Sequence, residues 1–316
     1  MSWEEFLCDK KNRIDVAEFT VHFMDNVCSL QQELKDKTYQ HGTYHSFKVH
    51  DPKPREIHKA NVRDRLVHHA VHRRLYPHFD RQFIFDSYSC RIDKGTHRAV
   101  NRFRQFANKV SRNHTRTAWV LKGDIRKFFA NIDHAILKNI LGCDAPPDAD
   151  ILQLLWHMVD SFHTEDKPGV GLPIGNLTSQ LFVNIYMNKF DQFVKRKLKI
   201  EHYIRYSDDF VILHESKLYL QNLIPVLAHF LKTELKLTLH PDKLFIKTVA
   251  SGVDFLGWIN FPDHRILRTS TKRRMLKKLK NFTSSDETLA SYLGLLSHGD
   301  TYELSQAVRS FGIQPH

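Results

Sequence analysis

Two adjacent acids, Asp208 and Asp209, stand between two short apolar segments of the chain. The segments, residues 203–206 and 210–213, have the composition of strands, so we expect the acids at the tip of a tight hairpin. Like charges about 4 Å apart repel by about 4 kcal/mol at an effective dielectric constant of 20. On spacing alone, a solvated polar turn accounts for the pair, because aspartate is a good turn former. The alternative is a site for divalent cations, which needs a third carboxylate from elsewhere in the chain.

Asp124 is the natural candidate for that third carboxylate. It lies at the charged end of another apolar segment, residues 118–125, which could form a strand beside the hairpin. Three carboxylates facing one point could bind two Mg²⁺ ions about 3.5–4 Å apart, as two-metal phosphoryl and nucleotidyl transfer requires. By composition alone, a nuclease and a polymerase remain equally plausible.

The elements that must position these acids alternate between helical and strand patterns, which predicts an α+β fold. The expected helices cover residues 14–36, 61–81 with Pro77 ending or bending the helix, 132–141, 176–198 capped by Asn176, and 218–235. The expected strands are a small basic hairpin around residues 47–57, then residues 118–125, 203–206, 210–213, 243–248 and 255–261. A glycine-punctuated loop is expected at residues 169–175.

The composition favours polyanionic partners or an acidic surface. The 316 residues include 47 Lys and Arg against 35 Asp and Glu, a formal net charge of +12. No uninterrupted apolar run exceeds four residues, so no membrane-spanning helix is expected. The N-terminus carries acids where a signal peptide has bases, and the four cysteines form no Cys-x-x-Cys pair, which together favour a reducing, cytoplasmic setting.

The 21 histidines raise the question of a metal site. His68, His69 and His72 have the spacing of helix neighbours, but solvated or phosphate-contacting histidines in a basic chain explain them without a missing ligand. We therefore expect no histidine metal centre.

Two motifs carry a resemblance to a known family. Residues 206–209, Tyr-Ser-Asp-Asp, resemble the Tyr-x-Asp-Asp box of reverse transcriptases, and residues 122–134 resemble their first catalytic-aspartate motif, in the family's order. The resemblance extends to residues 62–70, 87–91 with 95–97, 171–188, 237–243 and 255–258, so that it spans about residues 47–261. It implies a right-hand polymerase with fingers, a palm whose antiparallel sheet presents the acids, and a short helical thumb.

Within that family the chain is most similar to the enzymes of diversity-generating retroelements. Most reverse transcriptases carry Gln-Gly followed by Ser-Pro before the long palm helix, whereas here Ile174-Gly175 is followed by Ser179-Gln180. The Gly-x-x-x-Ser-Gln form and the segment at residues 63–70 resemble the diversity-generating branch. That branch copies a template-repeat RNA into cDNA with errors at template adenines. The replacement of a hydrogen-bonding Gln by Ile174 predicts lower fidelity.

The resemblance assigns catalytic roles. Asp124, Asp208 and Asp209, with the backbone carbonyl of Ile125, would hold two Mg²⁺ ions, and Lys243 would protonate the leaving pyrophosphate.

The resemblance also assigns nucleotide-binding residues. Phe129 would block the 2′-hydroxyl of a ribonucleotide, although core packing, which Phe128 could equally provide, also explains an aromatic there. Basic side chains would grip the triphosphate, because a guanidinium donates two parallel hydrogen bonds to phosphate. The implied nucleotide-binding residues are Lys53, Arg55, Arg91, Phe129, Ile174, Gly175 and Gln180, with Ser179 beside them.

The C-terminal region resembles a primer grip followed by a thumb. Residues 264–280 carry eight positive charges and no acid after Asp263, which indicates a helix that tracks the template–primer backbone rather than a merely solvated face. The implied template–primer contacts are Gly257, Trp258, Arg273, Arg274 and Lys277. The expected domains are a helical extension at 1–46, fingers and palm at 47–250, and primer grip and thumb at 251–316.

The sequence thus predicts an RNA-directed DNA polymerase that uses dNTPs, an RNA template and a DNA or RNA primer. The family context implies a small basic accessory protein and a prokaryotic or phage host. A retron or group II intron-like reverse transcriptase is the alternative within the class. A non-catalytic RNA-binding assembly or defence protein of the same fold is the alternative outside it.

Overall fold

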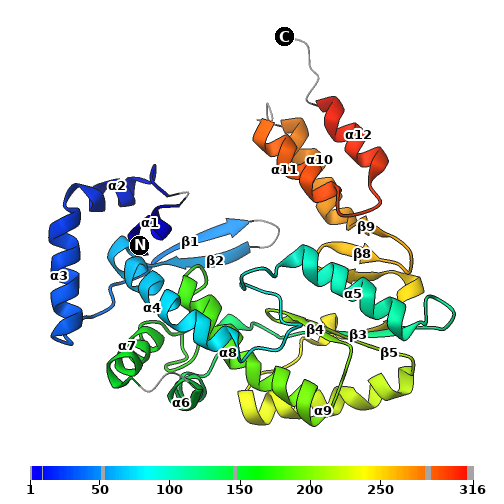
Figure 1. Cartoon of the computed structure of the whole chain (residues 1–316), viewed down its shortest axis with the longest axis horizontal. Helices are drawn as coiled ribbons and strands as arrows, with labels where there is room; N and C mark the ends of the chain where they lie inside the picture. The colour runs from blue at the N-terminus through cyan, green and yellow to red at the C-terminus, as the bar shows by residue number, and fades with distance from the viewer. Residues whose placement is uncertain (1, 9, 51–53, 145–147, 282–285, 312–316) are drawn as a thin grey trace. The chain divides into compact units, whose positions relative to one another are not determined.

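The computed structural model describes residues 2–8, 10–50, 54–144, 148–281 and 286–311 (Figure 1). The chain forms two compact units, each built from separate stretches of sequence. The first unit comprises residues 1–85, 125–199 and 227–239, and the second comprises residues 86–124, 200–226 and 240–316. Each unit is described by itself below.

The second unit is organised around an antiparallel sheet with the strand order β4-β5-β3-β6. The strands are β3 (Trp119–Asp124), β4 (Tyr203–Tyr206), β5 (Asp209–His214) and β6 (Phe245–Thr248), with the 3₁₀ turns η3 (Pro241–Lys243) and η4 (Val249–Ser251) on either side of β6. The central strands are rich in Val, Ile, Leu and aromatic residues, which favour a pleated, buried surface. The expected antiparallel palm-like sheet is therefore confirmed.

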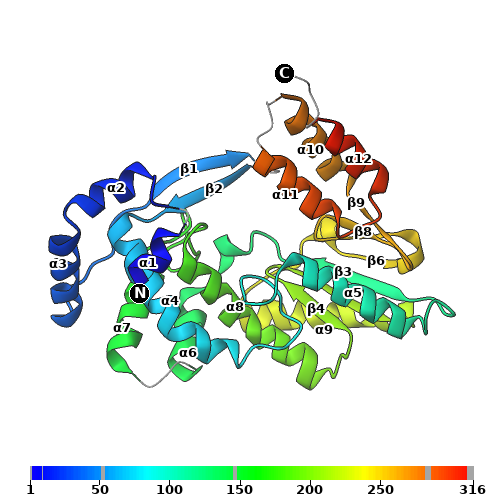
Figure 2. The same ribbon diagram turned by 45° about the horizontal axis from the view of Figure 1, so that its top comes forward.

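One face of this sheet is covered by α5 (Thr96–Val110), which runs alongside β4 and β5 (Figure 1). A second antiparallel sheet follows, made of β7 (Val253–Phe255), β8 (Trp258–Asn260) and β9 (Arg265–Leu267). Helices α10 (Thr269–Asn281), α11 (Asp286–Leu296) and α12 (Tyr302–Phe311) pack together beyond it (Figure 2). All these elements contribute to one hydrophobic core, in which Phe103, Phe255 and Trp258 are almost fully buried.

The first unit is mainly helical. Its N-terminal part contains α1 (Ser2–Leu7), α2 (Ile14–Val21) and α3 (Phe23–Lys35), followed by the hairpin of β1 (His45–His50) and β2 (Pro54–Lys59). The remaining elements are α4 (Val62–Asp80), η1 (Phe129–Asn131), α6 (His134–Asp144), α7 (Ala149–Asp160), α8 (Leu177–Gln192) and the π-helical turn η2 (Phe193–Lys197). Helix α4 packs against α8, and α6 packs against both α7 and α8. Helix α9 (Lys217–Leu235) has its first half in the second unit and its second half in the first.

The structure corrects several expected elements. The helix expected over residues 14–36 is interrupted at His22, where φ −113° and ψ 38° separate α2 from α3. Helix α4 continues through Pro77 to Asp80, so this proline does not end it. The strand expected over residues 255–261 is strand only at β8, residues 258–260, because the turn at residues 256–257 separates it from the end of β7. Helix α8 gives way to a π turn at Phe193.

The expected cap at Asn176 is wrong as well. Asn176 stands at the N-cap position of α8, but its side chain makes no capping hydrogen bond. Instead, its Oδ1 accepts from Ala60 N at 3.3 Å, and its Nδ2 donates to His58 O at 2.8 Å. The side chain therefore ties the start of α8 to the segment between β2 and α4. Within the described ranges, no helix combines the length and the apolar character needed to cross a membrane.

Candidate active site

The strand register brings the predicted acids together in the second unit. Asp124, the last residue of β3, pairs directly with Asp209, the first residue of β5. Directly opposed residues of an antiparallel pair have Cα atoms about 4.5–5.5 Å apart and side chains on the same face. Asp208 immediately precedes Asp209 in the turn between β4 and β5. The expected hairpin with acids at its tip is therefore confirmed, with Asp124 on the neighbouring strand.

The turn between β4 and β5 has a strained backbone, which a buried arginine stabilises. Ser207, its first residue, has φ 57°, in the left-handed region that favours glycine at this position of a two-residue hairpin. Arg205, whose side chain is fully buried, donates from Nη1 to Ser207 O at 3.0 Å and from Nη2 to Ser87 Oγ at 3.1 Å. The buried guanidinium of Arg205 thus fixes the backbone of the turn that carries Asp208.

The segment that carries Arg91 is attached to the same turn. Residues 86–88 run parallel to β4, where Arg205 N donates to Asp86 O and Tyr88 N donates to Arg205 O, both at 3.0 Å. Arg91 donates from Nη1 to Ser87 O at 3.0 Å. Arg91 therefore lies in the same unit as the three acids, linked to them through Ser87 and Arg205.

Gly123, beside Asp124, has a packing role. A Cβ at this position would lie 2.4 Å from the ring of Phe210, the residue opposite on β5. The Phe210 ring thus lies across the glycine on the face opposite to the acids, which locks the β3–β5 register behind them.

Two lysines lie among the acids. Lys243 donates from Nζ to Asp124 Oδ2 at 2.6 Å, and it is placed there because His240 N donates to Asp124 O at 2.8 Å. Lys122, largely buried on β3, has its Nζ 3.7 Å from Asp209 Oδ1 and donates to Asp254 O at 3.1 Å. Lys243 is the residue predicted to act as a proton donor, and the structure brings it to the acids.

The electrostatics of the cluster are unfavourable for the charged carboxylates. Burial raises the pKa of Asp208 above its ordinary value, and the carboxylate of Asp124 raises it further. Burial also raises the pKa of Asp209 to about 6, and the charges of Asp208 and Asp124 add to this while Lys122 opposes it. The folded chain therefore holds negative charges where they repel each other.

The donor set of this cluster fits divalent cations. Asp124 Oδ1 is buried and has no hydrogen-bond partner among the described residues. Carboxylate and carbonyl oxygens are the ligands that Mg²⁺ prefers, and a cation would relieve the repulsion among the acids. As the side chains stand, no group of three or more His, Cys, Asp or Glu within the described ranges is placed to hold a metal ion.

In the first unit, the β1–β2 hairpin is joined to the loop before α8. His58 N donates to Ile174 O at 2.9 Å, and a Cβ at Gly175 would lie 2.8 Å from Ile57 Cγ2. Gly175 has φ 114°, a conformation that side chains rarely adopt. The predicted residues Ile174 and Gly175 therefore lie beside the base of the hairpin that carries Arg55. Lys53, also predicted to bind the triphosphate, lies outside the described residues.

The two phenylalanines after Asp124 have different surroundings. Phe128 is buried with 3% of its surface exposed, whereas Phe129 is partly exposed and its carbonyl accepts from Leu172 N at 2.8 Å. Phe128 is thus the core residue, and the Phe129 ring packs edge-on against it with ring centroids 5.7 Å apart. Ile125, whose carbonyl is a predicted metal ligand, is buried directly after Asp124.

The predicted primer grip and thumb residues differ in exposure. Leu256 and Gly257 have φ 52° and 87°, the pattern of a type I′ turn between β7 and β8. Trp258 has only 1% of its surface exposed and packs in the core, so its side chain supports the turn rather than reaching a nucleic acid. On α10, Arg273, Arg274 and Lys277 are exposed, whereas Met275 and Leu279 face the core.

A buried polar network lies next to α8 and was not predictable from the sequence. His41 Nε2 and His68 Nε2 lie 3.1 Å apart, and His68 Nδ1 contacts Thr178 Oγ1 in the first turn of α8. His41 Nδ1 lies 2.7 Å from Gly42 O, so this ring nitrogen is the donor to the carbonyl. Its members are 27 and 110 residues apart in sequence, so no local spacing reveals it.

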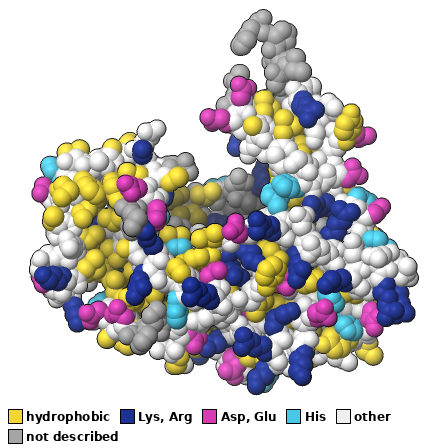
Figure 3. Space-filling model, in the orientation of Figure 1, with side chains coloured by type: hydrophobic (Ala, Val, Ile, Leu, Met, Phe, Trp, Pro, Cys, Tyr) yellow, Lys and Arg dark blue, Asp and Glu magenta, His cyan; other side chains and the backbone are white. Residues whose placement is uncertain are grey.

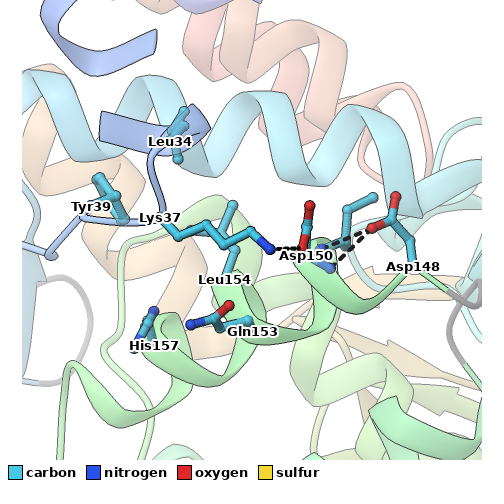
Figure 4. A pocket seen from close by; sticks show the side chains of 9 residues that line it. Leu34, Lys37, Tyr39, Asp148, Asp150, Gln153, Leu154 and His157 are labelled. Carbon is cyan, nitrogen blue, oxygen red and sulfur yellow. Dashed lines mark hydrogen bonds and ion pairs between the residues drawn. The ribbon is translucent and has the colours of Figure 1, made fainter. Parts of the chain in front are cut away.

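A pocket of the first unit lies between the end of α3 and α7 (Figure 4). Lys37 spans part of it and pairs with Asp150 at 2.6 Å, while Asp148 caps α7 by accepting from the backbone N of Asp150 and Ile151 (Figure 4). Lys37 and Asp150 thus neutralise each other, Asp148 is taken up by backbone N–H groups, and no predicted site residue lines the pocket.

The sequence is similar to those of known proteins over most of its length. The family model "Reverse transcriptase (RNA-dependent DNA polymerase)" matches residues 48–260. Protein YkfC of Escherichia coli is 25% identical over 268 residues, covering 71% of this chain and 68% of YkfC. The group II intron-encoded protein LtrA of Lactococcus lactis is 24% identical over 335 residues, covering 84% of this chain and 54% of LtrA.

Solved structures show the same fold. Apo telomerase from Candida tropicalis superposes with a TM-score of 0.55 at 12% identity, over 80% of this chain and 54% of that one. Telomerase from Candida albicans bound to a fragment of telomeric RNA has a TM-score of 0.53 at 10% identity, over 86% and 55% of the two chains. The chain spans about half the length of LtrA and of these telomerases.

Proposed function

Because this chain belongs to the reverse transcriptase (RNA-dependent DNA polymerase) family, we propose that it copies RNA into DNA at the carboxylates of Asp124, Asp208 and Asp209. The observation that carries the proposal is the pairing of Asp124 with Asp209 beside the Asp208 turn. The unpartnered Asp124 Oδ1 and the raised pKa values of Asp208 and Asp209 support it, because such a cluster is costly unless a cation binds.

We propose that the three carboxylates and the Ile125 carbonyl hold two Mg²⁺ ions. When bound, such ions lower the pKa of the attacking hydroxyl and stabilise charge on the leaving phosphate oxygen. The primer 3′-oxygen then forms a bond to the α-phosphorus of the dNTP, and the bond from that phosphorus to the β-phosphate oxygen breaks.

The side chains of this chain orient the substrates and move the protons. The ammonium of Lys243, held beside Asp124, donates a proton to the departing pyrophosphate. Arg91 and the finger residues Lys53 and Arg55 bind the triphosphate. The partly exposed ring of Phe129 excludes the 2′-hydroxyl of a ribonucleotide.

We also propose the diversity-generating subtype, in which a template-repeat RNA is copied with errors at template adenines. Its support is the loop before α8, where Ile174, Gly175, Ser179 and Gln180 depart from the usual Gln-Gly and Ser-Pro pattern. Ile174 is half-buried at the base of the β1–β2 hairpin, where an apolar side chain offers no hydrogen bond to a nucleotide.

The group II intron-like alternative is supported by the similarity to LtrA. The two subtypes differ in error spectrum, since only the diversity-generating one concentrates errors opposite adenine. We further propose a small basic accessory protein, a cytoplasmic location and a prokaryotic or phage host. The division into an extension at 1–46, fingers and palm at 47–250, and primer grip and thumb at 251–316 remains a proposal.

The test is Mg²⁺-dependent extension of a DNA primer on an RNA template containing all four bases, with the products sequenced. Synthesis that is lost in Asp208→Ala supports the polymerase, and errors opposite adenine that decrease in Ile174→Gln support the subtype. Equal error rates at all four bases would move the protein to the intron-like branch. Absence of synthesis, even with an accessory protein and cognate RNA, would favour the non-catalytic RNA-binding alternative.

A Phe129→Ala variant tests the proposed selection of dNTPs in the same assay. We expect it to incorporate ribonucleotides that the natural protein rejects, while dNTP incorporation persists. Unchanged discrimination would remove Phe129 from the nucleotide site.

A further inference from the structure

A second basic stretch, besides that of α10, runs through α5. Residues 94–123 contain no acid and eight basic residues, as many as residues 264–280. These residues are Lys94, Arg98, Arg102, Arg104, Lys109, Arg112, Arg116 and Lys122. The motifs that identify the active site assign no role to most of them.

The charged and the apolar residues of α5 lie on opposite faces of the helix. Ala99, Val100, Phe103, Phe106, Ala107 and Val110 are buried in the core of the second unit. The opposite face exposes Arg98, Arg104 and Lys109, with the amides of Asn101 and Gln105 between them. The loop after the helix, residues 112–117, is exposed throughout and adds Arg112 and Arg116. Figure 3 shows Lys and Arg side chains gathered over α5 and its C-terminal end.

Among the exposed basic residues of α5 and the loop, ion pairs within the described part of the chain are few and weak. Arg102 is taken up by a pair with the buried Asp86, at 2.8 Å. Arg98 reaches Asp93 only at 4.0 Å and Arg116 reaches Glu215 at 3.7 Å, and all four side chains are more than half exposed. Such pairs are weak and are screened by salt. In the described part of the chain, Lys109 and Arg112 have no carboxylate within ion-pair distance.

The surface begins at the active site. Thr96, the first residue of α5, donates from Oγ1 to the hydroxyl of Tyr206 at 3.3 Å. Tyr206 stands three residues before Asp209 in the chain. Gly95 N donates to Tyr88 O at 2.9 Å, next to the segment that holds Arg91. A helix of this length extends about 22 Å. Successive phosphates of one strand in a duplex are about 3.4 Å apart along the axis, so the basic face is long enough to follow roughly six phosphates away from the acids.

The character of this face favours a nucleic acid over a protein. Among the described residues between Asp93 and Ala118, no large hydrophobic side chain is exposed. Protein interfaces have an apolar core, whereas nucleic-acid surfaces combine Lys and Arg with side-chain amides and hydroxyls. Asn101, Gln105, Asn113 and Thr115 supply such groups here.

We propose that the exposed face of α5 and the loop at residues 112–117 bind the phosphates of an RNA strand that continues beyond the active site. This surface deepens the proposed function, on which it rests, because it holds the template outside the place of synthesis. It adds RNA contacts that are separate from the basic face of α10.

The test measures RNA binding with metal chelated, so that synthesis does not interfere. The variant Arg98→Glu, Lys109→Glu, Arg112→Glu should bind a single-stranded RNA of about 40 nucleotides at least about 30-fold more weakly at about 0.1 M salt. The same three positions changed to Gln should lower the slope of log K against log salt by about 2, since each phosphate contact on a single strand contributes about 0.7.

A matched control carries the same loss of charge elsewhere. Lys35, Arg196 and Lys197 are exposed on α3 and η2, and their reversal to Glu should leave RNA binding within about twofold of the natural protein. Extension of a short primer–template with an overhang of only a few nucleotides should likewise be unchanged in the α5 variant. Circular dichroism melting checks that all variants are folded.

The outcomes separate the alternatives. Unchanged RNA binding in the α5 variant, or an equal loss in the control, overturns the proposal. Loss of binding to phosphatidylserine vesicles with RNA binding intact would assign the face to a membrane and also overturn it. If the natural protein makes no DNA but its RNA binding still depends on α5, the proposed polymerase function fails while this surface stands.

Discussion

Two buried polar clusters, one in each unit, differ in how well their carboxylates are satisfied. Asp64 in the first unit has no exposed surface, and its oxygens accept from Tyr39 Oη and Gly42 N, both at 2.8 Å. Asp124 in the second unit has 5% of its surface exposed, yet only Oδ2 has a partner, Lys243, while Oδ1 has none among the described residues.

This difference in hydrogen bonding indicates that the Asp64 cluster is structural and the Asp124 cluster is functional. A buried carboxylate with hydrogen bonds to both oxygens holds its neighbours in place. A buried carboxylate with an unpaired oxygen, beside two others whose pKa values are raised, costs stability that a bound cation would restore. Replacing residues in the two clusters should therefore change different properties of the protein.

The largest effect is expected from the catalytic acids. Asp124→Asn or Asp208→Ala should lower DNA synthesis at least about 10⁴-fold, equivalent to about 5.5 kcal/mol in the barrier. The same changes should leave the melting temperature in EDTA unchanged or higher, because they remove repulsion among buried charges. Primer extension and calorimetry on the same samples measure both. A marked drop in melting temperature would mean that these acids are structural like Asp64.

The opposite result is expected at Asp64. Asp64→Ala should lower the free energy of unfolding by about 3–4 kcal/mol, because Tyr39 and the Gly42 amide would be left buried without an acceptor. DNA synthesis per folded molecule should remain within a few-fold of the natural protein. Urea unfolding measures the first quantity, and active-site titration with a primer–template measures the second. A loss of specific activity without loss of stability would contradict the contrast between the clusters.

Arg205 combines features of both clusters. Its buried guanidinium has hydrogen-bond partners, as Asp64 does, but it holds the turn that carries Asp208. Arg205→Met should lower kcat about 100-fold, or about 2.7 kcal/mol, by releasing the Ser207 carbonyl and the Asp208 turn, while KM for dNTP changes little. Arg205→Lys keeps the charge and one donor and should recover part of kcat. A change confined to stability, or to KM, would show that Arg205 does not position the acids.

The sequence was sufficient to predict the acids but not everything around them. Asp208 and Asp209 were predictable because two short apolar strands leave a single turn for them, and Asp124 because it ends a third strand. Arg205 and its partner Ser87 were not, since they are 118 residues apart and meet only when residues 86–88 lie along β4.

Helix ends were predicted less well than helices. Asn176 has the residue type and position of a cap, yet its side chain bonds to His58 and Ala60, because tertiary partners outcompeted the local one. The basic face of α5 could have been found from the acid-free stretch at residues 94–123, but its exposure on one side of a helix became visible only with the fold.

The smallest effect concerns the pH dependence at His68, which is linked to the Asp64 cluster through His41. Burial lowers the pKa of His68 to about 3, so His68 is neutral in the folded protein at pH 5, where an unfolded histidine is mostly charged. The unfolded state therefore binds an extra proton below about pH 6.5, and the stability that His68 contributes is lost as the pH falls. Between pH 6.5 and 5 this loss amounts to about 2 kcal/mol.

His68→Gln should remove that part of the pH dependence. The variant is expected to be less stable than the natural protein at pH 7.5, because its contacts with His41 and Thr178 are altered. Its free energy of unfolding should nevertheless fall less steeply towards pH 5, and urea titrations across this range measure the difference. Other histidines with lowered pKa values, such as His72, contribute equally to both proteins and cancel in the comparison. Parallel curves for the two proteins would show that His68 is charged in the fold, and that this cluster too carries a cost that its hydrogen bonds do not remove.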